Sequence, residues 1–160
     1  MDISTITEAF SDVTIQLPTV GVMLAGLLAV ALVFLSAFAS GSEIAFFSLS
    51  PSDVAELEDG KNPSDRKIQM LREDSERTLA TILITNNFVN VMIVMLLSNI
   101  FVSIVKFGPK AYWLEFLIMT VFLTFLLLLF GEIMPKVYCR QNPLRFCRRC
   151  VDAILFARKI

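Results

Sequence analysis

Three long apolar runs constrain the fold of this chain more than any other feature. They cover residues 19–39, 78–105 and about 112–138. An α-helix rises about 1.5 Å per residue, so each run is long enough to cross the roughly 30 Å hydrocarbon core of a bilayer. Backbone N–H and C=O groups in lipid need partners within their own segment, which favours helices over open strands. The sequence therefore predicts an all-α membrane protein with three transmembrane helices.

Composition excludes several classes of function. Hydrophobic residues make up 56% of the chain, above the roughly 45–50% of ordinary globular proteins. The net charge is −1, so a nucleic-acid partner has no electrostatic basis. The chain has no histidine, which removes imidazole zinc sites and histidine-based catalytic triads. No nucleophile is paired with a base, so we expect no enzyme. The motif Cys147-Arg148-Arg149-Cys150 is a single C-x-x-C, and its thiols are expected to be incidental.

The distribution of lysines and arginines predicts which side of the membrane each segment faces. They are frequent in residues 51–77 and after residue 136, absent from residues 1–18, and limited to two in residues 106–110. Positive charge favours the cytoplasmic side, so residues 1–18 are expected to form an extracytoplasmic leader. The C-terminus is expected in the cytoplasm.

Two cytoplasmic helical regions are predicted outside the spans. In residues 51–75, Ser50 caps a helix that ends at Gly60, and a second helix follows to about residue 74, giving a helical hairpin within the 19–138 transmembrane domain. A tight turn is expected at residues 106–110. Residues 139–160 alternate arginines with apolar residues, which predicts a basic juxtamembrane helix on the inner membrane surface, with membrane lipid as its partner.

The third run ends in a stretch that combines an acid and a proline. Glu132 lies where the chain is still in or just leaving hydrocarbon, and a charge at that depth usually has a partner or a task. Pro135 supplies no N–H, so the carbonyl of Gly131 loses its helix donor. A carboxylate and a free carbonyl at one depth are two hard oxygen ligands, which favour a hard cation. The alternative is an interfacial acid that faces cytoplasmic water.

The first two runs carry polar residues at helical spacing. Ser36 and Ser40 share one face, as do Asn86 and Asn90. Taken singly, such serines usually bond a carbonyl one turn back, and such amides bond each other across helices. The segment 40–43, Ser-Gly-Ser-Glu, is also expected to open the backbone locally.

These polar residues are expected at a similar depth in the membrane. All three helices carry their oxygen groups in the inner half of the bilayer, by the predicted orientation. Hydroxyl, amide, backbone carbonyl and carboxylate oxygens are ligands for Mg²⁺, Ca²⁺ or Na⁺ rather than for zinc or copper. The predicted metal-binding residues are Ser36, Ser40, Asn86, Asn90, Gly131 and Glu132.

Three stretches resemble one known family. Residues 36–43, 85–90 and 131–136 look like the signature stretches of the CorC/cyclin M (CNNM) transmembrane domain, in order and spacing. The resemblance implies a homodimer of three-helix protomers in a bacterial inner membrane, each with a juxtamembrane helical belt and a dehydrated Mg²⁺. By that resemblance, Ser40, Asn86, Asn90 and Glu132 supply side-chain oxygens, and Gly131 and Ser36 supply main-chain or outer oxygens.

The same resemblance implies a function. The family is described as Mg²⁺ transporters, commonly with Na⁺-coupled export, and carries cytoplasmic paired CBS nucleotide-binding modules. This chain has Thr85 where the family often has Gly, and Ala39 where it often has Phe. The expected function is a membrane Mg²⁺ transport domain. The alternative is a non-transporting Mg²⁺ sensor or scaffold module. Transport and sensing need the same pocket, so the sequence leaves both open.

Overall fold

The computed structural model describes residues 13–108 and 112–159, and the chain is almost entirely helical there. Its elements, in chain order, are β1 (Thr14–Ile15), α2 (Val20–Phe47), α3 (Pro51–Glu58), α4 (Asp65–Glu73), α5 (Ser75–Ile104), β2 (Val105–Lys106), α6 (Tyr112–Leu126), the π-helix η1 (Leu127–Ile133), α7 (Met134–Cys139) and α8 (Pro143–Lys159).

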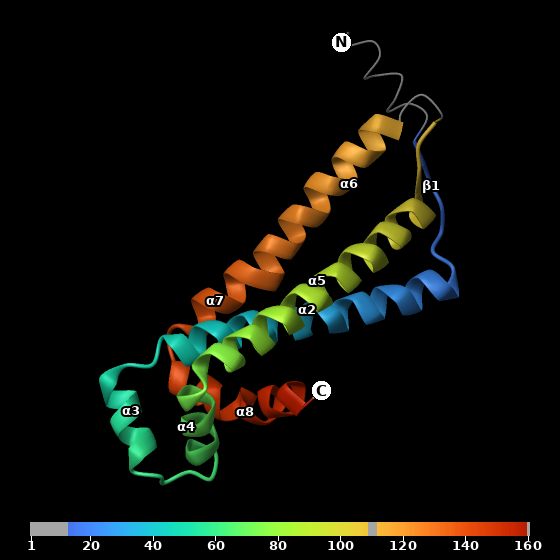
Figure 1. Cartoon of the computed structure of the whole chain (residues 1–160). Coiled ribbons are helices and arrows are strands. Elements are labelled where there is room, and N and C mark those ends of the chain that lie inside the picture. The colour runs from blue at the N-terminus through green and yellow to red at the C-terminus, as the bar shows by residue number, and fades with distance from the viewer. Residues whose placement is uncertain (1–12, 109–111, 160) are drawn as a thin grey trace.

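Three continuous helical segments are long and apolar enough to span a membrane. They are Val20–Phe47, Ser75–Ile104 and Tyr112–Cys139, the last comprising α6, η1 and α7. Figure 1 shows α2 and α5 lying against each other, with the third segment beside them and α6 diverging toward its own N-terminal end. The prediction of an all-α membrane protein with three transmembrane helices is confirmed.

The first span differs from its prediction in one respect. α2 continues without a break through residues 40–43, so the expected opening of the backbone there is wrong. Ser42 donates its hydroxyl proton to the Phe38 carbonyl at 2.7 Å, one turn back in the same helix. Gly41 serves close packing instead, because a Cβ there would lie 2.6 Å from Cys139 Sγ and 3.1 Å from the Phe146 ring.

The hairpin forms as two short helices, α3 and α4. The Ser50 hydroxyl accepts the Asp53 backbone N–H, and the Asp53 carboxylate accepts the Ser50 N–H, so the capping box forms at the start of α3. Gly60 ends this part of the chain with φ of +62°, a left-handed conformation that glycine adopts without steric cost. The predicted two-helix hairpin is therefore confirmed.

The basic C-terminal helix, α8, packs on protein rather than presenting its apolar face to lipid. Its buried side chains join those of α2 to α5 in one core. That core contains Ala45, Phe46, Leu57, Ile68, Leu71, Ile82, Leu144, Cys147, Cys150, Val151 and Ile154. The amphipathic helix forms as expected, and its apolar face packs on protein. The ends of α2 and α5 nearest the hairpin, together with α4, cover that face. The position of α8 on the inner membrane surface stays a prediction.

Ion pairs fix α8 to the hairpin. Arg148 binds the buried carboxylate of Asp65 through two nitrogens, at 2.8 and 3.2 Å, and contacts Glu56 at 2.9 Å. These hydrogen bonds lower the pKa of Asp65 and raise that of Arg148, since each partner stabilises the other's charged form. Arg158, further along α8, binds Asp74 through one nitrogen.

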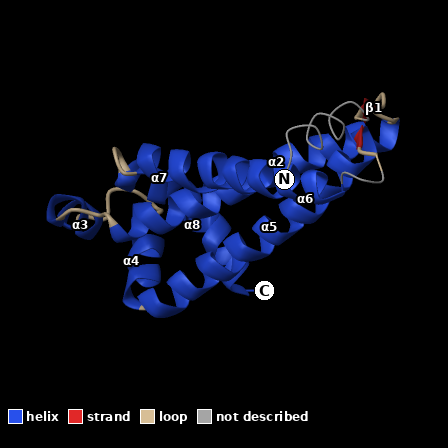
Figure 2. Cartoon of the chain, turned by 90° about the horizontal axis from the view of Figure 1, so that it is seen from above, coloured by secondary structure: helices blue, strands red, loops and turns tan. Residues whose placement is uncertain are grey.

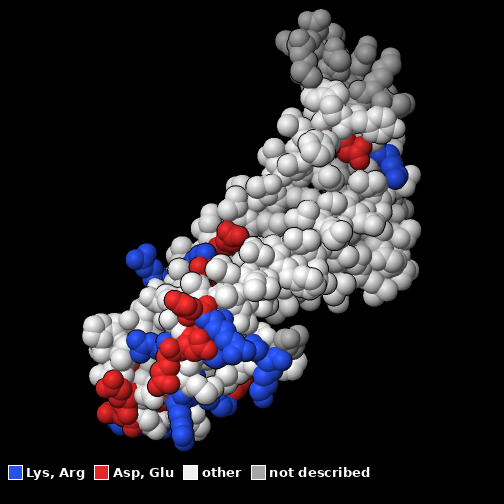
Figure 3. Space-filling model, viewed as in Figure 1, with Lys and Arg blue, Asp and Glu red and all other residues white. Residues whose placement is uncertain are grey.

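Charges gather at this end of the molecule. Figure 3 shows Lys, Arg, Asp and Glu over the hairpin and α8, whereas the long middle of the visible face carries almost none. Figure 2 shows the same end from above, with α3 and α4 projecting beyond the long helices. We call the part formed by α3, α4 and α8 the hairpin end.

At the opposite end, two short strands join segments far apart in sequence. β1 pairs antiparallel with β2, with Thr14 opposite Lys106 and Ile15 opposite Val105. This pairing was not predicted from the sequence, which indicated a tight turn at 106–110. Residues 109–110 of that turn, and residues 1–12 of the predicted leader, lie outside the described residues.

Candidate metal centre

The predicted residues meet where α2, α5 and η1 come together. Ser36 and Ser40 are one turn apart on α2, and Asn86 and Asn90 are one turn apart on the facing side of α5. Ser36, Ser40 and Asn86 are buried, and Asn90 is partly buried. Apolar packing below and above this level holds the helices in register, with Leu32, Val89 and Ile93 forming one buried cluster beside the site.

Four side-chain oxygens converge between α2 and α5. Ser36 Oγ lies 2.6 Å from Asn90 Oδ1 and 3.1 Å from Asn86 Oδ1, and Ser40 Oγ lies 3.4 Å from Asn86 Oδ1. A serine hydroxyl has one proton, so Ser36 can donate to only one of its two amide neighbours at a time. The amides direct their oxygens, rather than their NH₂ groups, at the serines. The two amide oxygens have four lone pairs between them, and the two hydroxyl protons can use only two of these.

The third helix approaches this cluster through a residue without a side chain. A Cβ on Gly131 would lie 3.2 Å from Ser36 Oγ and 4.0 Å from Asn90 Oδ1. The first distance is shorter than an ordinary van der Waals contact, so Ser36 would have to move to accept a methyl group. Gly131 is therefore the residue that lets the backbone of η1 come close to the oxygens.

The backbone of the third helix is wound differently at this level. Residues Leu127–Ile133 form a π-helix, and the Met134 N–H donates to the Leu129 carbonyl, five residues back. π-helical turns inside α-helices are rare and often mark functional sites. Pro135 follows at once and supplies no N–H of its own. An unpaired carbonyl was expected here from the sequence, but the π-helix was not, and Gly131 and Pro135 were its available signals.

Glu132 lies next to the cluster rather than within it. It follows Gly131 directly and is partly buried. Among the residues that the structure describes, no Lys or Arg forms an ion pair with its carboxylate. The structure thus brings Ser36, Ser40, Asn86, Asn90 and Gly131 together and leaves Glu132 one residue away with an unpaired charge. That these six residues bind a metal stays a prediction.

One nearby ion pair was not anticipated. Lys136 Nζ lies 3.2 Å from Glu43 Oε2 and joins α7 to α2. Its sequence signal was available, because Glu43 follows Ser36 by seven residues and Lys136 follows Glu132 by four. Both intervals keep a residue on nearly the same helix face.

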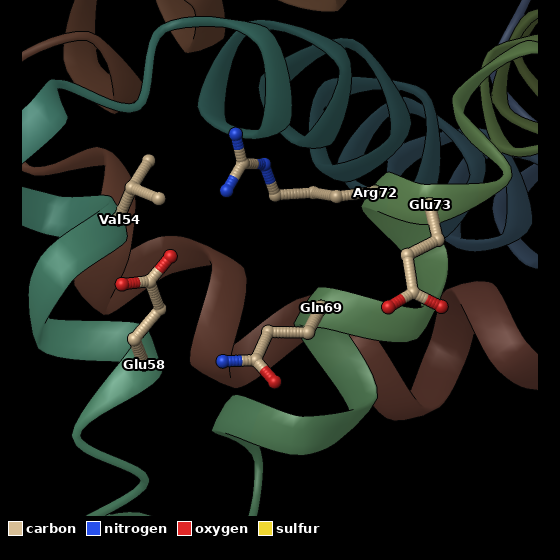
Figure 4. A pocket seen from close by; sticks show the side chains of 5 residues that line it. All are labelled: Val54, Glu58, Gln69, Arg72 and Glu73. Atoms are coloured by element: carbon tan, nitrogen blue, oxygen red, sulfur yellow. The ribbon is translucent and has the colours of Figure 1, made fainter.

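A pocket in the described part of the chain lies elsewhere. It has a volume of about 410 Å³ between α3 and α4, and its lining residues are Val54, Glu58, Gln69, Arg72 and Glu73. Figure 4 shows the Glu58 and Arg72 side chains pointing into it from the two hairpin helices. None of the predicted metal-binding residues lines this pocket, so it is separate from the oxygen cluster.

Comparison with known proteins found a matching family and similar curated proteins. Residues 27–160 match the family described as the cyclin M transmembrane N-terminal domain. A metal transporter, cnnm-4, of Caenorhabditis elegans is 30% identical over 127 residues, which cover 76% of this chain and 26% of that protein. A putative DUF21 domain-containing chloroplastic protein of Arabidopsis thaliana is 36% identical over 129 residues, covering 81% of this chain and 18% of that protein.

The matched region contains every predicted metal-binding residue. It begins at residue 27 and includes all three spans, apart from the first turns of α2. The chain spans 26% and 18% of the two relatives, so it corresponds to a part of each. The matched descriptions name a transmembrane domain and a metal transporter, not an enzyme, which confirms the expectation that the chain is not an enzyme.

Proposed function

Because this chain belongs to the cyclin M transmembrane N-terminal domain family, we propose that it is a membrane domain that transports a metal ion, and that the ion is Mg²⁺. The observation that carries the proposal is the convergence of four serine and asparagine oxygens beside Gly131. The relative named as a metal transporter supports the same function.

The ligand chemistry favours Mg²⁺. The cluster offers oxygens only, without the thiolate or imidazole groups that zinc and copper prefer. Adjacent oxygens around an octahedral Mg²⁺, with bonds of about 2.0–2.1 Å, are roughly 3 Å apart. The three oxygen–oxygen distances in the cluster are 2.6, 3.1 and 3.4 Å, which scatter around that spacing. Small movements of these side chains would let them share one such ion.

Glu132 would supply the charge that the neutral oxygens lack. Mg²⁺ gives up its water reluctantly, so a dehydrated site needs several fixed oxygens and at least one full negative charge. The carboxylate of Glu132 is adjacent to Gly131, and no Lys or Arg among the described residues neutralises it. A turn of this side chain toward Asn90 would complete the site. The carbonyl of Gly131 would add a main-chain oxygen.

The remaining details of the proposal concern the assembly and direction of transport. The hairpin end would face the cytoplasm of a bacterial inner membrane, because most Lys and Arg residues lie there. The exposed apolar side chains of the spans would contact membrane lipid and a second copy in a homodimer. By family resemblance, Na⁺ would couple to Mg²⁺ export, and cytoplasmic CBS-type nucleotide-binding modules would act with this domain.

Ion flux tests the proposal. The chain is reconstituted in liposomes, and Mg²⁺ movement is measured for wild type, Glu132→Gln and Asn87→Ala. Asn87 is the matched control, because its amide is exposed and takes no part in the cluster. We expect flux from wild type and Asn87→Ala and none from Glu132→Gln. Mg²⁺ binding without flux in wild type would instead support the sensor or scaffold function, and equal flux in Glu132→Gln would contradict the site.

A further inference from the structure

The ion pair between Glu43 and Lys136 lies on the hairpin side of the metal centre. Glu43 follows Ser36 by seven residues on the uninterrupted helix α2, so it keeps the same face about 10 Å further along. Lys136 follows Glu132 by four residues, which places it about one turn further in the same direction. Any ion that passes between the site and the hairpin end along this face therefore meets the pair.

The pair joins two helices that are packed tightly at the same level. Next to it, Gly41 on α2 lies so close to α7 that a Cβ would come within 2.6 Å of Cys139 Sγ. Both Glu43 and Lys136 are partly buried, so their charges are only partly screened by solvent. Lys136 thus has one carboxylate across the helix interface, Glu43, and a second, Glu132, four residues earlier on its own helical segment.

Glu43 and Glu132 can both pair with Lys136, but only Glu132 is also expected to bind the metal ion. Glu132 needs a positive partner whenever no metal ion is beside it, because an unpaired charge at this depth is costly. When a metal ion binds, a lysine at Glu132 would repel it. The structure has Lys136 at Glu43, which is the arrangement that leaves Glu132 free to bind an ion.

We infer that Lys136 is a tethered cation that exchanges between Glu43 and Glu132. It neutralises Glu132 when the metal ion has left and returns to Glu43 when the ion binds. When Lys136 pairs with Glu132, Glu43 loses its cationic partner on the hairpin side of the site. The contact between α2 and α7 then loosens. This inference rests on the proposed function, since it requires that Glu132 bind the ion.

Single substitutions of Lys136 and Glu43 should change the Mg²⁺ affinity in opposite directions. Mg²⁺ affinity is measured by titration calorimetry on the whole chain in detergent. Lys136→Gln removes the competitor for Glu132, so we expect Mg²⁺ to bind about tenfold more tightly, within the usual range of such couplings. Glu43→Gln removes the other partner of Lys136, which keeps the lysine at Glu132, so we expect several-fold weaker binding. Lys136→Arg keeps the charge and should remain close to wild type.

The double variant separates exchange from simple electrostatics. If the two charges act on the ion independently, Glu43→Gln combined with Lys136→Gln should cancel and restore wild-type affinity. If Lys136 exchanges, Glu43 matters only through Lys136, and the double variant should bind as tightly as Lys136→Gln alone. A purely structural pair would instead make all three variants less stable, with no tightening in any of them.

The outcomes distinguish this inference from the function on which it rests. Tight binding in both Lys136→Gln and the double variant supports exchange. Wild-type affinity in the double variant, or unchanged affinity in Lys136→Gln, overturns exchange and leaves the metal centre intact. If wild type binds no Mg²⁺, or if Glu132→Gln binds it equally well, the proposed function fails and the exchange fails with it.

Discussion

Replacing Gly131 by alanine tests how closely the third helix approaches the oxygen cluster. The added methyl group would lie 3.2 Å from Ser36 Oγ and 4.0 Å from Asn90 Oδ1. Ser36 would have to shift by a few tenths of an ångström, away from the position in which its oxygen faces both asparagines. The change therefore acts on the geometry of the site without removing any of its oxygens.

The expected loss of Mg²⁺ affinity in Gly131→Ala can be put in numbers. Holding a side chain away from its preferred rotamer costs about 0.5–1.5 kcal/mol, which corresponds to a roughly 2- to 10-fold weaker Kd for the ion. Alanine in a helix is also more stable than glycine by about 0.5–1 kcal/mol, which offsets the crowding. We therefore expect Gly131→Ala to bind Mg²⁺ several-fold more weakly while its thermal stability without Mg²⁺ stays near that of wild type.

Two other glycines provide matched controls. Gly26 has no atom within 4 Å of where its Cβ would lie, so Gly26→Ala should leave both Mg²⁺ affinity and folding intact. Gly41 packs against Cys139 and Phe146, so Gly41→Ala should lower the free energy of unfolding by about 1–3 kcal/mol. Titration calorimetry and thermal unfolding in detergent measure the two quantities. Wild-type Mg²⁺ affinity in Gly131→Ala would refute the close approach of η1 to the site.

Three further predictions follow from particular residues. Asn90→Asp adds a carboxylate beside the site, so Mg²⁺ should bind more tightly and flux through liposomes should slow; unchanged binding would exclude Asn90 from the site. Asp65 has a pKa below its ordinary 3.8 because Arg148 binds it, so its stabilisation is complete above about pH 4 and is lost as pH falls through the lowered pKa. Thermal unfolding below pH 4 should therefore decline more steeply in wild type than in Asp65→Asn, and parallel curves would contradict this. Single cysteines placed at Ser4 and Ser64, in a cysteine-free background, should be labelled from opposite sides of the membrane, Ser4 from outside; labelling of both from one side would overturn the orientation.

The spans could be predicted because their signal is local and strong. Length and hydropathy alone located α2, α5 and the third segment, and the capping box and Gly60 located the hairpin. The spacing of Ser36 with Ser40, and of Asn86 with Asn90, was enough to place two pairs of oxygens on single helix faces. The structure then placed these two faces against each other.

The features that were missed depend on contacts between distant residues. Ser40 to Glu43 contains a serine pair and a glycine that favour an open backbone, but packing against Cys139 keeps α2 regular. The π-helix at Leu127–Ile133 lies where the third helix contacts α2, a contact between residues far apart in the sequence. The apolar face of α8 was predicted correctly, whereas its partners, α2, α5 and α4, could be identified only in three dimensions.

Direct Mg²⁺ binding by Asn90→Ala tests the central claim, that oxygens from separate helices hold one ion. Wild type, Asn90→Ala and the control Asn87→Ala are titrated with Mg²⁺ under identical conditions in detergent. We expect about one ion per chain in wild type and Asn87→Ala, and at least tenfold weaker binding in Asn90→Ala, because truncating a ligand removes about 1.4 kcal/mol or more. Equal affinity in all three proteins would contradict the account, since Asn90 would then serve only to join α5 to α2.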